Sequence, residues 1–193
     1  MDTALQHDTI ALIRQGCRAA AGPLQRVAEV GVKAVHRFRF DIGGMRDFSE
    51  EKIRKSVEHR ADFQQLAAVR GPAVYVFEIC PPGNSVNVLA AAKLYADTKT
   101  RAVPARRINI DNTSSVLYVG KVSSVPLSMR VIQHLGFSRS AATQGLQLYH
   151  WARELSLILD MTVFEFEDDM AAPLPLVERA VAQQLRPLLG KHE

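Results

Sequence analysis

The amino-acid sequence predicts a mixed α+β fold, within the α/β class in its broad sense. From Gly71 onward the segments follow one another as strand, insertion, strand, helix, helix, strand and helix. The chain has 193 residues, 47% of them hydrophobic, which suits one domain, or one domain with an extension, that buries its own core. Helical patterns dominate residues 1–70, so we expect this part to be a mostly helical N-terminal extension.

The expected elements of the N-terminal part are an amphipathic helix over 3–21, a short helix over 24–35, a strand over 36–40 and a charged helix over 49–69. Gly22-Pro23 is a typical helix stop, so it separates the first two helices. In the strand, Arg37 and Arg39 alternate with aromatic residues and therefore share one face. Gly71-Pro72 places a domain boundary after residue 70.

Residues 71–193 alternate between apolar β-branched runs and helical patterns. The expected elements are strands over 73–79, 106–110, 115–119 and 162–167, and helices over 86–100, 127–135, 146–159 and 175–185. Residues 80–114 form an insertion between the first strand and the strand at 115–119. We expect these strands to form a small sheet that is flanked by helices.

The net charge of +4 and the isoelectric point of about 9.3 permit a nucleic-acid partner without requiring one. The two cysteines, Cys17 and Cys80, exclude a disulfide framework and a cysteine-rich zinc finger. No run approaches the ~18 apolar residues of a membrane span. Charged residues such as Arg14 interrupt what would have to be the apolar core of a signal peptide. We therefore expect a cytoplasmic protein with no membrane partner.

Three groups of residues carry candidate chemistry. Tyr75 and Tyr118 lie on predicted strands, and Gly120-Lys121 after Tyr118 permits close approach and adds a cation. Arg130 and His134 are four residues apart, on one face of a predicted helix. Glu178 lies in the first turn of the last helix. Taken singly, each group also suits a structural role: core aromatics, a solvated helix face, or compensation of a helix dipole.

In this order and spacing the three groups resemble the GIY-YIG nuclease family. Ala73-Val74-Tyr75 stands at the GIY element and Tyr118-Val119-Gly120 at the YIG element. Lys121, Arg130, His134 and Glu178 match the family's lysine, helical arginine, histidine and metal-binding glutamate, so the resemblance covers about residues 71–192. It implies a small antiparallel GIY-YIG-type sheet and metal-dependent endonuclease activity. The chain departs from the family in its long insertion and in Gly190, which replaces the usual Asn of a Pro-x-x-Asn motif.

The chemistry of these residues suits phosphodiester hydrolysis. Glu178 is the one carboxylate of the set, which fits a single Mg²⁺ or Mn²⁺ ion rather than a two-metal site. Arg130 offers a charged fork to the scissile phosphate. Because Lys121, Arg130 and a bound cation would lower the pKa of a nearby phenol, we expect Tyr118 or Tyr75 to position or activate the water, with His134 as its proton partner. Which tyrosine does so stays open at this point.

Charged residues outside the set allow two interpretations. Arg37, Arg39, Arg106 and Arg107, with other basic residues, could follow a phosphate backbone or could be scattered surface charge. Glu165 and Glu167 alternate with phenylalanines, so we expect them on the solvated face of a strand rather than in a metal cluster.

The leading hypothesis is a Mg²⁺-dependent endonuclease that cuts DNA in a restriction-like or mobile-element role. The alternative is a nucleic-acid-binding module of the same fold with weakened catalysis, which Gly190 favours. A third reading, a scaffold that binds no nucleic acid, leaves the basic charge incidental. The choice between DNA and RNA is open, and a homodimer that reads a palindrome is compatible with a chain of this size.

Overall fold

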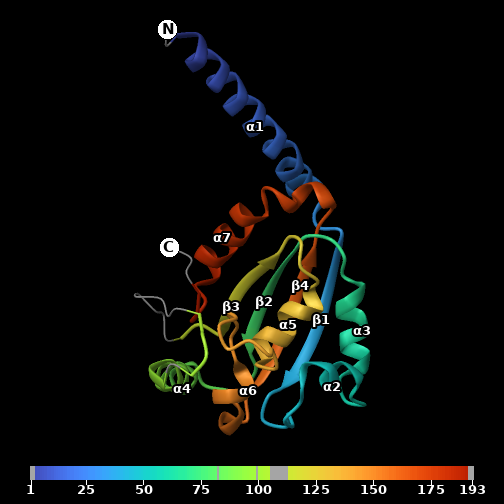
Figure 1. Cartoon of the computed structure of the whole chain (residues 1–193), viewed down its shortest axis with the longest axis vertical. Coiled ribbons are helices and arrows are strands. Elements are labelled where there is room, and N and C mark those ends of the chain that lie inside the picture. Colours follow the sequence, from blue (N-terminus) through green and yellow to red (C-terminus); the bar gives the residue numbers. More distant parts are fainter. Residues whose placement is uncertain (1–2, 82, 99, 105–112, 191–193) are drawn as a thin grey trace.

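A four-stranded antiparallel sheet organises the molecule, and the mixed α+β prediction is confirmed (Figure 1). The computed structural model describes residues 3–81, 83–98, 100–104 and 113–190. The strands are β1 (Ala34–Asp41), β2 (Ala73–Ile79), β3 (Val116–Val122) and β4 (Ile158–Glu165), in the order β1-β4-β2-β3. The α-helices in the described residues are α1 (Thr3–Val30), α2 (Glu50–Lys55), α3 (Arg60–Ala68), α4 (Ser85–Thr98), α5 (Leu127–Leu135), α6 (Leu148–Trp151) and α7 (Leu174–Leu185).

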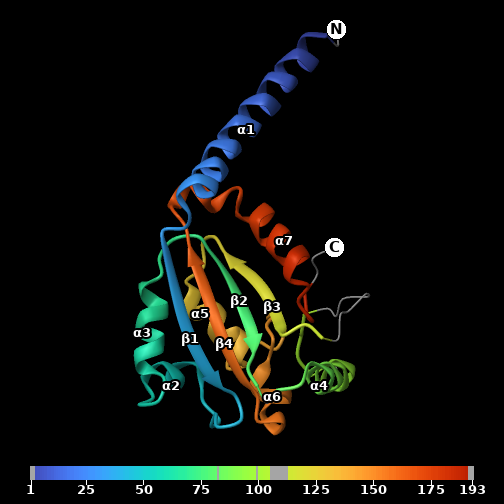
Figure 2. The same ribbon diagram turned by 180° about the vertical axis from the view of Figure 1, so that it is seen from behind.

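The two faces of the sheet bury different side chains. Tyr75 and Phe77 of β2 point to a large core that contains residues of α3, α5 and α6, while Val74 and Val76 point to a smaller core beneath α7. Figures 1 and 2 show α5 on one side of the strands and α7 near β3 at the upper edge. α7 contacts β3, which is an edge strand of the sheet, and the neighbouring β2.

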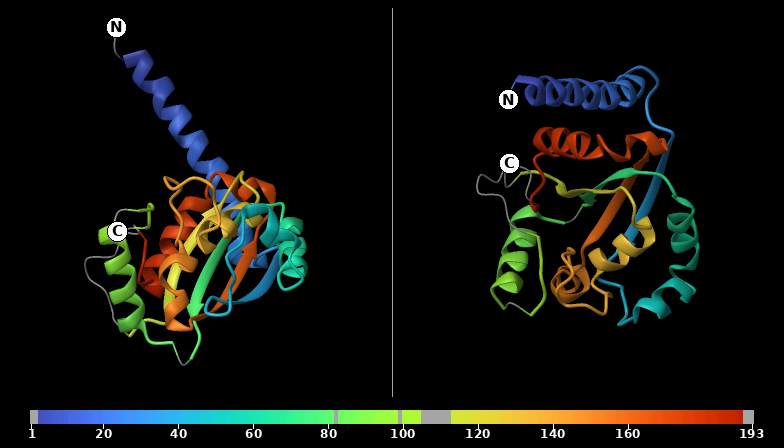
Figure 3. Two further views of the ribbon diagram at one scale, coloured as in Figure 1. Left: turned by 60° about the horizontal axis from the view of Figure 1, so that its bottom comes forward. Right: turned by 45° about the horizontal axis from the view of Figure 1, so that its top comes forward.

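Helix α1 continues through the expected stop at Gly22-Pro23, so the prediction of two helices was wrong. A proline removes only its own backbone donor, and the alanines at 19–21 favour a helix strongly. Leu24 and Val27 also pack against the smaller core, which stabilises the second half of the helix. The helix ends at Gly31, whose φ of +91° is the left-handed conformation of a glycine cap. Figure 3 shows the N-terminal half extending away from the sheet.

The boundary expected after residue 70 does not separate two cores. β1 pairs with β4 along its whole length, and Phe38 and Phe40 belong to the same core as Tyr75. The predicted strand at 36–40 is thus correct, and its alternation leaves Arg37 and Arg39 exposed. Of the part before Gly71, only α1 projects from the body of the molecule (Figure 1).

Two expected helices are shorter in the structure. The helix over 49–69 begins at its Ser49 cap as expected but divides at Ser56, whose hydroxyl donates to the carbonyl of Ile53. The helix over 146–159 is reduced to α6 and the 3₁₀ turn Arg153–Leu155 (η1), because Leu159 and the alternate residues after it are buried in β4. The strand at 73–79 and the helix at 127–135 are confirmed, whereas the strand expected at 106–110 lies outside the described residues.

No helix in the part of the chain that the structure describes is long and apolar enough to cross a membrane.

Candidate active site

Gly120 allows the phenol of Tyr75 to lie flat against strand β3. The two residues are directly paired in the antiparallel ladder, and a Cβ atom at Gly120 would be 2.5 Å from Tyr75 Oη and 2.6 Å from Tyr118 Cε1. Tyr75 is fully buried, and Tyr118 is 9% exposed. The close approach expected at Gly120 therefore involves the two tyrosines of the chain's own site.

His134 and Arg130 of α5 both donate hydrogen bonds to Tyr75. His134 Nδ1 accepts the backbone N–H of Leu146 at 3.2 Å, which assigns the proton of the neutral ring to Nε2. Nε2 lies 2.8 Å from Tyr75 Oη, and Arg130 Nε lies 3.3 Å from the same oxygen. The structure thus brings together three of the predicted residues, with Tyr75 as the acceptor.

Burial dominates the protonation of this cluster. It holds the pKa of His134 well below 6.5, and the charge of Arg130 acts in the same direction. Burial also raises the pKa of Tyr75 and of Tyr118 above 10, although Arg130 opposes it. Desolvation of the phenolate therefore outweighs Arg130, so this arginine by itself does not give the lowered phenol pKa that was expected from neighbouring cations. Both tyrosines are protonated and His134 is neutral at pH 7.

Arg130 is fixed by groups that the sequence did not single out. Its Nη1 donates to Gln133 Oε1 at 2.8 Å and to the carbonyl of Gln144 at 2.5 Å, and its guanidinium also interacts with the Tyr118 hydroxyl. The loop after α5 thus supports both Arg130 and His134. Gly145 is the residue of the sequence that could have indicated this close packing of the loop on α5. A Cβ atom at Gly145 would be 2.2 Å from the carbonyl oxygen of Gln133, so a larger residue would not fit there.

Glu178 approaches the tyrosines from α7. It is half-buried, one helical turn from Leu174 and from Ala182, which both pack on the smaller core. Its charge raises the pKa of Tyr75 and of Tyr118, after the larger effect of burial. Glu178 therefore acts electrostatically on the same two phenols that Arg130 contacts.

Lys121 is not beside the phenols. It pairs with Val74 in the β2–β3 ladder, so it shares the face of the sheet that α7 covers, opposite to Tyr75 and Gly120. The sequence placed Lys121 next to Tyr118 because the two are close along the chain, but strand alternation separates their side chains. Tyr75, Tyr118, Arg130, His134 and Glu178 form the candidate site, and the side chain of Lys121 lies on the α7 face of the sheet.

Glu165 of β4 differs from the expectation that it lies on a solvated face, whereas Glu167, just after the strand, is exposed as expected. Glu165 is only 6% exposed instead of solvated, and its carboxylate lies 3.0 Å from His36 Nε2, 3.3 Å from the backbone N of Gly71 and 3.5 Å from Lys33 Nζ. Despite burial, these partners lower the pKa of Glu165. Glu165 therefore serves as a structural anion that joins β4 to β1 and to the start of β2.

Glu178 is the carboxylate of the candidate site that could bind a metal ion. No group of three His, Cys, Asp or Glu side chains that could hold a metal occurs among residues 3–81, 83–98, 100–104 and 113–190. Mg²⁺ commonly keeps several waters and takes one or two carboxylates together with phosphate oxygens. The single carboxylate of Glu178 fits that mode of binding and does not fit a site with several protein ligands.

Two of the four arginines proposed to contact nucleic acid, Arg37 and Arg39, lie away from the site. Arg37 and Arg39 are exposed on β1, the edge strand farthest from β3, and Arg39 Nε is 3.6 Å from Asp160. Arg106 and Arg107 lie outside the described residues.

The C-terminal segment runs beside Tyr118. Leu188 and Leu189 donate to the carbonyls of Val116 and Leu117, and Leu189 forms a parallel bridge with Tyr118. Gly190 follows with φ of +119°, a conformation that disfavours every residue with a Cβ atom. Glycine at this position is therefore required by the local backbone.

Comparisons with protein-family models, with curated proteins and with solved structures found no match to this chain.

Proposed function

We propose that the protein is a GIY-YIG-type endonuclease that hydrolyses phosphodiester bonds of DNA with the help of Mg²⁺ or Mn²⁺. The observation that carries the proposal is that Arg130 donates to Tyr75 and interacts with Tyr118, while the charge of Glu178 acts on the same two phenols. A permanently charged guanidinium, a phenol and a lone carboxylate supply phosphate binding, orientation of water and a metal ligand.

The two tyrosines differ in solvent exposure, and we assign them different roles on this basis. Tyr75 has no accessible surface and accepts hydrogen bonds from His134 and Arg130, so it acts as a positioning residue. Tyr118 keeps 9% of its surface accessible, and we assign to it the contact with the attacking water or the phosphate. His134 donates to Tyr75 in its neutral tautomer, so it orients the cluster instead of receiving a proton from Tyr75.

Arg130 and Glu178 bind the charged groups in this mechanism. The fork of Arg130 is held by Gln133 and Gln144 in a fixed direction, which favours binding of the phosphoryl oxygens without reorganisation. Glu178 would hold the divalent ion, which when bound supplies positive charge beside those oxygens.

The proposal is tested by cleavage of a linear DNA duplex in Mg²⁺ by Arg130→Ala and Glu178→Ala, both with intact folding. We expect each variant to lose about 10²-fold or more in rate, the size typical of removing one electrostatic contact to a transition state. Glu167→Ala, an exposed carboxylate outside the site, is the matched control. An unchanged rate in either site variant would refute the assignment.

The second candidate is a nucleic-acid-binding module with weakened catalysis. Gly190 favours it, because glycine stands where the nuclease family usually has an asparagine. Salt-sensitive DNA binding without cleavage would support the module, whereas the scaffold reading requires that no salt-sensitive binding occurs. A restriction-like or mobile-element role and a cytoplasmic location also remain predictions, to be tested with defined DNA sites and by cell fractionation.

The homodimer is proposed on the surface of α1. Ile10 and Ile13 are 47% and 60% exposed. With Cys17 they are spaced i, i+3, i+7, so they form a stripe along α1 that leads toward Leu24, which packs against the smaller core. Light scattering should give twice the mass of 21.4 kDa for the natural chain and the single mass for Ile10→Asp/Ile13→Asp. A monomeric natural chain would exclude the dimer.

A further inference from the structure

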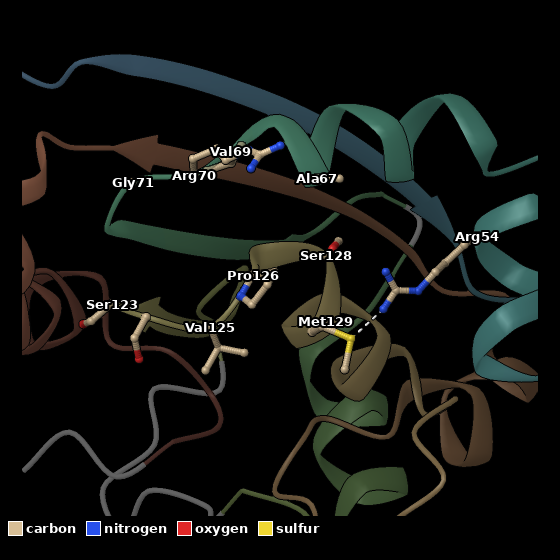
Figure 4. A pocket seen from close by; sticks show the side chains of 11 residues that line it. Arg54, Ala67, Val69, Arg70, Gly71, Ser123, Val125, Pro126, Ser128 and Met129 are labelled. Atoms are coloured by element: carbon tan, nitrogen blue, oxygen red, sulfur yellow. Dashed lines mark hydrogen bonds between the residues drawn. The ribbon is translucent and has the colours of Figure 1, made fainter.

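A cationic cleft lies at the start of α5, directly before Arg130 in the chain. Its volume is about 360 Å³, and it is bounded by the end of α2, the connection from α3 to β2 and the connection from β3 to α5 (Figure 4). This volume is at the lower end of the range for small ligand sites, which suits a phosphate with its attached sugar better than a large cofactor.

The charge of the cleft favours an anion. Arg54 and Arg70 are the ionisable residues among the described residues that line it, and Ser123, Ser124 and Ser128 add hydroxyl groups. In Figure 4 the guanidinium of Arg54 points toward the start of α5. A phosphate oxygen can accept hydrogen bonds from guanidinium and hydroxyl groups together, whereas a cation would be repelled.

Arg54 is poorly matched with its present partners. It donates to the sulfur of Met129 at 2.6 Å, a weak acceptor, and its closest ion-pair contact, to Glu50, is 3.8 Å long. Arg70 is exposed and has no ion pair among the described residues. An anion in the cleft would therefore gain contacts that the protein itself supplies only weakly.

The position of the cleft relates it to the candidate site. Ser128 and Met129 line the cleft, and Arg130 follows them within one turn of α5, a rise of about 1.5 Å per residue. Each strand of B-DNA carries a phosphate about every 3.4 Å along the helix axis. A strand with one phosphate at Arg130 therefore carries its neighbouring phosphates at a spacing comparable with the short rise along α5 that separates Arg130 from Ser128 and Met129.

We propose that this cleft binds a second phosphate of the nucleic-acid strand whose scissile phosphate lies at Arg130. The inference rests on the proposed nuclease function for the identity of the strand. It gives residues 34–70 a role in the substrate path, since Arg54 and Arg70 come from that part of the chain. The phosphate contact positions the strand and carries no sequence information.

The test uses the full chain and the double variant Arg54→Gln/Arg70→Gln. Arg18→Gln/Arg60→Gln is the control, because both of its arginines are exposed and lie outside the cleft, so the loss of charge is the same. In the first arm, inorganic phosphate is titrated and the backbone amide resonances of residues 123–125 and 127–129 are followed by NMR. We expect saturable shifts in the natural chain and the control, and their loss in the double variant; absence of shifts in the natural chain overturns the cleft as a phosphate site, whatever the fate of the nuclease proposal.

In the second arm, binding of a DNA duplex in EDTA is measured as a function of salt. Each lost phosphate contact reduces the steepness of the plot of log binding constant against log salt concentration by about 0.9. The double variant should therefore bind DNA roughly tenfold or more weakly than the control at 0.1 M salt. An unchanged slope beside normal phosphate shifts would show that the cleft does not serve the nucleic acid. A natural chain that takes up phosphate in the cleft but binds no DNA would overturn the strand assignment together with the nuclease proposal.

Discussion

The phenol of Tyr75 shows how burial decides the role of a single residue. Its oxygen accepts hydrogen bonds from His134 and Arg130, and Tyr75 has no accessible surface. Removal of this oxygen would therefore leave two buried donors without their acceptor. Tyr118, on the neighbouring strand, retains a small accessible surface. A tyrosine thus has a structural role in β2, at Tyr75, and is a candidate for substrate contact in β3, at Tyr118.

Tyr75→Phe and Tyr118→Phe should therefore separate stability from activity. We expect Tyr75→Phe to lower the free energy of unfolding by about 1–3 kcal/mol, the cost of buried donors that lose their acceptor. Tyr118→Phe should retain most of the stability but lose about 10²-fold in cleavage rate. Urea unfolding and a cleavage assay measure the two effects, and the reverse pattern would contradict the division of roles.

The depressed pKa of His134 predicts a loss of stability in mild acid. The folded ring stays neutral well below pH 6.5, whereas the unfolded ring takes up a proton near pH 6.5. The unfolded state then binds more protons, so stability falls as the pH drops below about 6.5, by up to ~1.4 kcal/mol per pH unit. Urea unfolding of the natural chain and of His134→Gln at pH 7.5, 6.0 and 5.0 measures this difference, and equal pH dependence of the two would disprove it.

Gly120→Ala should displace the tyrosines. The added Cβ would meet Tyr75 Oη at 2.5 Å, and we expect overpacking to cost about 1–3 kcal/mol of stability. Gly16→Ala is the matched control: nothing lies within 4 Å of its Cβ in α1, so it should stabilise the helix by about 0.5–1 kcal/mol. Thermal unfolding of both variants gives the comparison, and equal stabilities would argue against the close packing at Gly120.

At the scale of elements, tertiary packing overrides local stop signals in one place and local hydrogen bonds interrupt an expected helix in another. Pro23 does not end α1, because Leu24 and Val27 are anchored on the smaller core. Ser56 does interrupt the helix that begins at Ser49, because its side chain accepts and donates within its own turn. Neither outcome could be read from residue type alone, since both residues are compatible with either structure.

Continuity of α1 predicts the effect of Pro23→Ala. A proline inside a helix costs up to about 3 kcal/mol relative to alanine, so the variant should stabilise the turn around residue 23. Hydrogen exchange of the amides from Ala20 to Val27 should slow markedly compared with the natural chain. Unchanged exchange over these residues would mean that the helix is interrupted at Pro23.

At the scale of the whole molecule, the strands and helices of the second half were largely predictable, because the run at 73–79 and the periodicity at 127–135 are locally decisive. The membership of β1 in the same sheet was not, since pairing with β4 joins residues that lie 117 to 131 positions apart in the sequence. In the site, the shared helix face of Arg130 and His134 was predictable from their spacing, whereas Tyr75 was singled out by the family resemblance. The placement of Lys121, the burial of Glu165 and the support of Arg130 by Gln144 depend on the assembled sheet and loop.

The most direct test of the nuclease assignment is cleavage of supercoiled plasmid DNA in Mg²⁺, in Mn²⁺ and in EDTA by the natural chain and by Glu178→Gln. The account predicts nicked or linear product with the natural chain in either metal, and none in EDTA or with Glu178→Gln. Cleavage by Glu178→Gln at the natural rate, or no cleavage by the natural chain in either metal, would contradict it.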